Sequence, residues 1–142
     1  IWGISVEKYL QKADVWPLNS DGEILLGVKI EDKVALSNTR SSLRVPGVGF
    51  AEGGPGDMSF SLGVWGLGKS NANLFRAPLP SEMQSARGRV LAACKENNLA
   101  FLNDATLENI AEMIREGVMI VAGASESVAN KGRQLTNRQM AW

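Results

Sequence analysis

Two strand-like segments decide the fold of this chain: ILLGVKIED at residues 24–32 and VGFAEGGPGDMS at residues 48–59. Each starts with apolar residues and ends in acidic residues or glycines, as strands of a parallel sheet do where they reach their loops. The stretch between them, VALSNTRSSLRV, has the length and apolar spacing of one helix. The order is therefore β-α-β, and a parallel crossover returns the second strand beside the first.

The rest of the chain continues this alternation. Strands are predicted at residues 24–30 (a buried strand), 48–52, 99–104 and 118–124, and helices at 4–13 (capped by Ser5), 32–43, 81–98, 106–117 (capped by Thr106, with Gly117 at its end) and 125–135. Residues 53–80, with six glycines and three prolines, are predicted to be irregular. Strict alternation predicts an α/β fold with a parallel sheet. The sheet is either small and open or half of a (β/α)₈ barrel, since a whole barrel needs about 250 residues.

Composition narrows the class of protein. The 142 residues suffice for a single domain over residues 1–142, and 15 Lys and Arg balance 15 Asp and Glu, which argues against a nucleic-acid partner. No apolar run approaches the ~20 residues of a membrane span. The single cysteine, Cys94, is predicted to pack in the core, and with no signal-peptide pattern it favours a cytoplasmic location. The chain has no histidine, which excludes a Ser-His-Asp triad or a His-ligated zinc within it.

Two acidic residues follow the first two predicted strands. Glu31 comes directly after the first strand, and Asp57 follows the second. Because parallel strands end at the same edge of a sheet, both carboxylates should emerge on one rim, and carboxylate oxygens suit a divalent cation. Each residue also has a simpler interpretation: Glu31 as the partner of Lys29 in a salt bridge, and Asp57 as a helix cap or turn former.

The glycine-rich turn at residues 53–57 adds a second argument. Its glycines allow a close approach of the backbone to a ligand, and successive N–H groups before a helical turn can bind an anion. A substrate carboxylate on these amides, next to a cation, suits a 2-oxo acid. Arg87 and Arg89, on the helix predicted to begin at Ser81, are expected to face solvent.

The run LLGVKIED…ALSN…VPGVGFAEGGPGDMSFSLG resembles the HpcH/HpaI-type class II pyruvate aldolases, the family that includes the citrate lyase β-subunit. The family pattern is Q-[IV]-E at the end of the fifth strand and G-P-x-D-[LM]-S at the end of the sixth. The resemblance covers essentially the whole chain. It implies the C-terminal half, strands five to eight, of a (β/α)₈ TIM barrel, so we expect a fragment of a longer barrel.

The resemblance also implies a site. Glu31 and Asp57 would ligate Mg²⁺ or Mn²⁺, with Co²⁺ or Zn²⁺ as alternatives. The implied substrate-binding residues are Gly54, Gly56, Asp57 and Met58. Lys29 stands where the family has Gln, which places a positive charge close to the metal. The family's base-assisting His and its enolate-stabilising Arg lie on earlier strands, so no catalytic residue is assigned here.

The implied reaction is metal-dependent cleavage of 2-oxo-3-deoxy or 4-hydroxy-2-oxo acids to pyruvate and an aldehyde, incomplete in this fragment, by a homo-oligomer. A lyase for citryl- or malyl-type coenzyme A thioesters is an alternative that no motif separates. A non-catalytic half-barrel that assembles through its edge strands is another. An unrelated small α/β binding domain would have no cation near Glu31.

Overall fold

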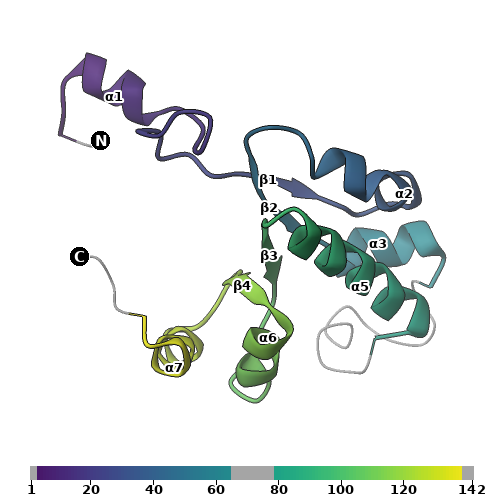
Figure 1. Cartoon of the computed structure of the whole chain (residues 1–142). Coiled ribbons are helices and arrows are strands. Elements are labelled where there is room, and N and C mark those ends of the chain that lie inside the picture. The colour runs from purple at the N-terminus through teal and green to yellow at the C-terminus, as the bar shows by residue number, and fades with distance from the viewer. Residues whose placement is uncertain (1–2, 65–78, 139–142) are drawn as a thin grey trace.

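The computed structural model describes residues 3–64 and 79–138. Its centre is a four-stranded, all-parallel sheet in the order β1-β2-β3-β4, so β1 and β4 are the outer strands (Figure 1). The strands are β1 (Leu26–Lys29), β2 (Val48–Glu52), β3 (Ala100–Asn103) and β4 (Val118–Val121). The parallel arrangement predicted from the alternation of elements is confirmed.

Helices connect these strands and lie against them. The described helices are α1 (Val6–Lys12), α2 (Lys33–Ser42), α3 (Pro55–Leu62), α5 (Ser81–Glu96), α6 (Ile110–Glu116) and α7 (Glu126–Thr136). In Figure 1, α2, α3 and α5 lie together on one side of the sheet and α1 lies apart. Within the described ranges, none of the helices is both long enough and apolar enough to span a bilayer.

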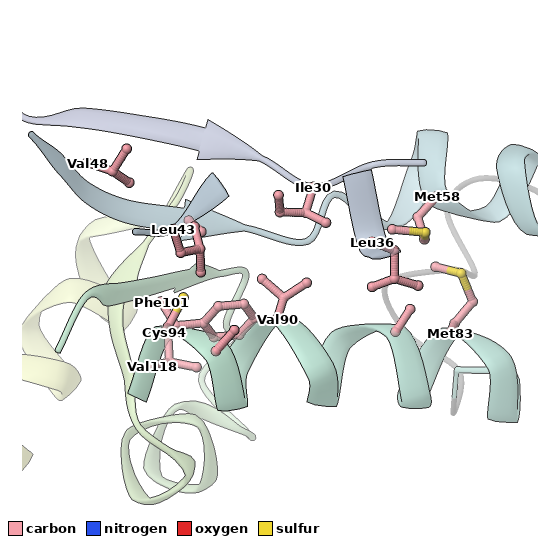
Figure 2. Close-up of a cluster of buried hydrophobic side chains, with 13 residues drawn as sticks. Ile30, Leu36, Leu43, Val48, Met58, Met83, Val90, Cys94, Phe101 and Val118 are labelled. Carbon is pink, nitrogen blue, oxygen red and sulfur yellow. The ribbon is translucent and has the colours of Figure 1, made fainter. Parts of the chain in front are cut away.

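The core lies between α5 and the two central strands. Ala51 on β2 and Phe101 on β3 are register partners, and both are buried. Val90 and Cys94 on α5 pack in the same cluster, which Figure 2 shows around the Phe101 ring. Burial raises the pKa of the Cys94 thiol to about 11, so the thiol stays protonated and serves as packing, as predicted.

The opposite face of the sheet is less covered. Its register row consists of Lys29, Glu52, Leu102 and Ile120, none of which is buried. The apolar residues 24–26 are each 43% to 45% exposed. The prediction of a buried first strand was therefore wrong: β1 is an outer strand, and the apolar residues at its start stay exposed.

The prediction of irregular structure across residues 53–80 was wrong for α3. Gly54 is the N-cap, and Pro55 occupies the first helical position, where its missing N–H costs nothing. Gly63 ends the helix at φ 74°, a left-handed conformation that glycine adopts readily. The glycines and proline that indicated a loop are thus the two ends of a short helix. Residues 65–78 of the predicted irregular stretch lie outside the described part of the chain.

The predicted cap of the helix after β3 was also wrong. Asn109, not Thr106, is the N-cap residue, and α6 begins at Ile110. The Asn109 side chain accepts a hydrogen bond from the Thr106 backbone N–H at 2.7 Å, which closes a turn before the helix. The predicted Ser5 cap of α1 and Gly117 end of α6 are both confirmed.

Asp32 caps α2 directly after β1. Its Oδ1 accepts hydrogen bonds from the backbone N–H groups of Val34 at 2.7 Å and Ala35 at 2.8 Å. We predict that Asp32→Ala lowers the free energy of unfolding by about 1 kcal/mol, whereas Asp32→Asn, which keeps an acceptor oxygen, loses much less. Urea denaturation followed by circular dichroism measures both. An equal loss in the two variants would contradict the cap.

Candidate functional site

The direction of the Glu31 side chain is set by its neighbours in the chain. The preceding residue, Ile30, is buried in the core and continues the β1–β2 pairing, with its N–H donating to the Glu52 carbonyl oxygen at 2.8 Å. The following residue, Asp32, caps α2. Because successive side chains of an extended strand point to opposite faces, burial of Ile30 turns Glu31 toward the less covered face.

The Glu31 carboxylate rests on the backbone of Gly54. A Cβ atom at position 54 would overlap Glu31 Oε1, so any residue other than glycine would force the Glu31 side chain to shift. Gly54 is also the N-cap of α3 and offers no side-chain cap to the helix. The backbone N–H groups of Gly56 and Asp57, in the first turn, are therefore without a capping side chain. Among the described residues, the space beside Gly56 is open, since a Cβ there would meet none of their atoms within 4 Å.

Asp57 is the third residue of α3, and its side chain is exposed. Glu31 and Asp57 thus both follow the carboxyl ends of neighbouring parallel strands. That they share one cation remains a prediction. Met58, the other residue implied for substrate binding, has its side chain in the core, 2% exposed, near Met83 (Figure 2).

Lys29 links the acidic groups of this rim. Its Nζ lies 3.0 Å from Glu31 Oε1 and 3.8 Å from Glu52 Oε2. The hydrogen bond with Glu31 is the main cause of its raised pKa, with further contributions from the charges of Glu52 and, less strongly, Asp57. The salt bridge that was the simpler interpretation of Glu31 is therefore present, and Lys29 stays positively charged.

Sequence reasoning missed two acidic residues of the same rim. Glu52 ends β2, and Asp104 directly follows β3. Burial is the main cause of the raised pKa of Glu52; the charges of Glu31 and Asp104 raise it further, and Lys29 opposes the shift. The rule that singled out Glu31, an acidic residue where a strand ends, would have found both.

A cavity of about 700 Å³ opens beside this rim, between α5 and α6. The described residues that line it include Gly53, Pro55 and Asp104, but neither Glu31 nor Asp57. The cavity therefore adjoins the acidic rim without containing the two predicted ligands.

Arg87 lines the same cavity, and the prediction that it faces solvent was wrong. Its Nη2 lies 2.6 Å from Glu116 Oε2, and its guanidinium stacks over the Phe101 ring at 5.5 Å from the centroid. Both contacts draw it between α5 and α6, where its side chain is only 19% exposed. Arg89, in contrast, is exposed as predicted.

The residues of the rim fit a cation held mostly by water and substrate. Among residues 3–64 and 79–138, no three His, Cys, Asp or Glu side chains gather closely enough to hold a metal ion. Glu31 and Asp57 would supply two oxygen ligands, which is a usual protein share for Mg²⁺. The ion pair between Lys29 and Glu31 is the one contact described here that competes with such an ion.

No protein-family model matches the sequence, and no curated protein does. Solved structures do. One is an HpcH/HpaI aldolase/citrate lyase family protein from Burkholderia cenocepacia J2315. The match covers 92% of this chain and 45% of that protein, with TM-score 0.58 and 26% identity. The match with macrophomate synthase covers 84% of this chain and 38% of that protein, with TM-score 0.60 and 18% identity. The match with the HpcH/HpaI aldolase of Desulfitobacterium hafniense DCB-2 covers 97% of this chain and 49% of that protein, with TM-score 0.56 and 19% identity.

This chain has the fold of half an HpcH/HpaI-type aldolase barrel. The predicted resemblance and fold class are confirmed. The half-barrel spans 38% to 49% of the lengths of these three structures. The single domain over residues 1–142 and the cytoplasmic location remain predictions.

The contact of Glu31 with Gly54 can be tested against an open position in the same turn of the half-barrel. Gly54→Ala should lower the free energy of unfolding by about 0.5–1.5 kcal/mol, because the added methyl forces the Glu31 side chain out of its present rotamer. Gly56→Ala, which meets open space, should change it much less. Urea denaturation measures both. The double variant Gly54→Ala, Glu31→Ala should recover most of the loss; no recovery would refute the contact.

The raised pKa of Glu52 predicts a pH dependence of stability. Since burial raises this pKa, the folded protein binds the Glu52 proton more tightly than the unfolded chain. Stability from this group therefore falls as the pH rises through the ordinary and then the raised pKa. Glu52→Gln cannot ionise at this position. The variant should therefore be more stable than the unsubstituted protein by a larger margin at neutral pH than at pH values below the ordinary carboxyl pKa. Urea denaturation across pH measures this gain; a gain independent of pH would contradict it.

Proposed function

We propose that this chain forms half of a divalent-metal carbon–carbon lyase that cleaves 4-hydroxy-2-oxo or 2-oxo-3-deoxy acids to pyruvate and an aldehyde. The observation that carries the proposal is the contact of the Glu31 carboxylate with Gly54 at the start of α3. It brings an acidic side chain to a helix N-terminus whose first N–H groups have no capping side chain. One rim thus offers oxygen ligands for a cation next to donors for an anion.

The cation would be held by Glu31 and Asp57. Both are carboxylates, and an all-oxygen ligand set suits Mg²⁺ or Mn²⁺ better than the softer metals. Glu31 is held in place by packing on Gly54, whereas Asp57 is exposed on the first turn of α3. Glu31 would therefore be the fixed ligand and Asp57 the one that adjusts.

The substrate carboxylate would bind at the start of α3. The N–H groups of Gly56 and Asp57 would donate to it, and the positive end of the helix dipole favours an anion there. Gly54 and Gly56 leave room for the ligand. Met58 would support this site indirectly, since its buried side chain fixes the first turn of α3 to the core.

A divalent cation at this site would polarise the keto oxygen of the 2-oxo acid and stabilise the negative charge that develops on it. The C4 hydroxyl loses its proton, the C3–C4 bond breaks, and its electron pair moves toward the keto group as the aldehyde leaves. Protonation at C3 then yields pyruvate. No base is assigned to this chain, which contains no histidine.

The remaining half of the barrel would supply the base. The matched structures are about twice the length of this chain, so a second four-stranded unit would have to complete the ring. The outer strands β1 and β4 are where that unit would pair, and assembly of complete barrels into a homo-oligomer is the expected quaternary form.

Calorimetric titration with pyruvate in the presence and absence of Mn²⁺ tests the proposal. Pyruvate should bind only when Mn²⁺ is present. Glu31→Gln and Asp57→Ala should each weaken the binding at least about tenfold, because each removes one of two carboxylate ligands. Circular dichroism checks that the variants fold.

Asp21→Ala is the matched control, since Asp21 is an exposed acidic residue in the loop before β1. It should leave pyruvate binding unchanged. Mn²⁺-dependent binding that survives Asp57→Ala and Glu31→Gln would refute the assigned ligands.

A further inference from the structure

Lys29 is shared between two carboxylates of unequal standing. Glu31 is the nearer at 3.0 Å and is a proposed metal ligand, whereas Glu52 is farther at 3.8 Å and has no role in the proposed site. Lys29 and Glu52 are register partners on neighbouring strands, so both point to the same face of the sheet. The Lys29 side chain is 59% exposed, which leaves its ammonium group free to move between them.

We infer that Lys29 is a positioning residue that exchanges Glu31 for Glu52 when a divalent cation binds, and that it thereby sets the metal affinity of the rim. The inference rests on the proposed function. It concerns a position where the sequence departs from the aldolase pattern, with Lys in place of Gln.

The exchange follows from charge. Glu31 Oε1 already accepts from the Lys29 ammonium group, so a cation at Glu31 would lie within a few ångströms of another positive charge. That repulsion is relieved if Lys29 leaves Glu31. Without a cation, Lys29 offsets the mutual repulsion of Glu31, Glu52 and Asp57, each of which acts on its pKa.

Glu52 lowers the free-energy cost of moving Lys29 away from Glu31. It lies at the end of β2, partly buried, close enough for Lys29 to turn to it without crossing the site. Ionised Glu52 loses hydration through burial, so the Lys29 ammonium group stabilises it by moving closer. Asp104, the other acidic neighbour of Glu52, adds to the same attraction. Lys29 is thus never left without a carboxylate partner.

Titration with Mn²⁺ alone, followed by calorimetry, tests the inference on the whole chain. Lys29→Gln should bind Mn²⁺ about tenfold more tightly than the unsubstituted protein, because it removes a competing positive charge. Lys29→Met should do the same without a polar head group. Lys12→Gln is the matched control: Lys12 also pairs with a glutamate, Glu23, but on α1, away from the sheet. It should leave the affinity unchanged.

A double-mutant cycle separates two effects of Glu52 on Mn²⁺ binding: its pairing with Lys29 and the direct attraction of its charge for the ion. Glu52→Gln should weaken Mn²⁺ binding severalfold, because Lys29 then has only Glu31 to pair with. In the Lys29→Gln background the same change should weaken binding much less. An equal effect in both backgrounds would overturn the exchange.

The outcomes distinguish this inference from the proposed function. If Lys29→Gln binds Mn²⁺ no more tightly while Glu31→Gln abolishes binding, the metal site stands and the exchange is wrong. If Glu31→Gln leaves Mn²⁺ binding intact, or if neither the unsubstituted protein nor Lys29→Gln binds Mn²⁺, both are wrong.

Discussion

The candidate site depends on the contact between the Glu31 carboxylate and the backbone of Gly54. Parallel pairing of β1 with β2 brings the two chain segments to the same edge, and glycine at position 54 lets them touch. A larger residue there would push the acid away from the first turn of α3. In the proposed site, the approach of the Glu31 carboxylate to the start of α3 therefore depends on the absence of a side chain at position 54.

The helix layer makes that contact rigid. Ile30 precedes Glu31 and Met58 lies in α3, one turn after Gly54, and both are buried in one core cluster with Val90 of α5. Since close-packed interiors resist displacement, the two connections cannot slide past each other. The residues that hold the rim are apolar and face the helices, whereas Lys29, Glu31 and Glu52 face the less covered side of the sheet.

The rim concentrates like charge at a cost in stability. Glu31, Glu52, Asp57 and Asp104 all lie at carboxyl ends of parallel strands or one turn beyond, and Lys29 offsets part of their repulsion. Like charges gathered at one edge oppose folding and are common at functional sites. Lys29 is the basic residue that pairs with two of these acids.

The sequence alone was enough to predict the parallel sheet and the N-cap at Ser5, and it offered the pairing of Lys29 with Glu31 as one interpretation, because these follow from local periodicity and spacing. It misjudged α3, where a proline and glycines that open and close a helix look like a loop. Only the tertiary structure decided that Glu31 touches Gly54, that Glu52 shares Lys29, and that Arg87 turns inward to Glu116. Those contacts join residues more than twenty positions apart. The first two depend on the pairing of β1 with β2 and the third on where α5 and α6 lie beside the sheet, which no local pattern encodes.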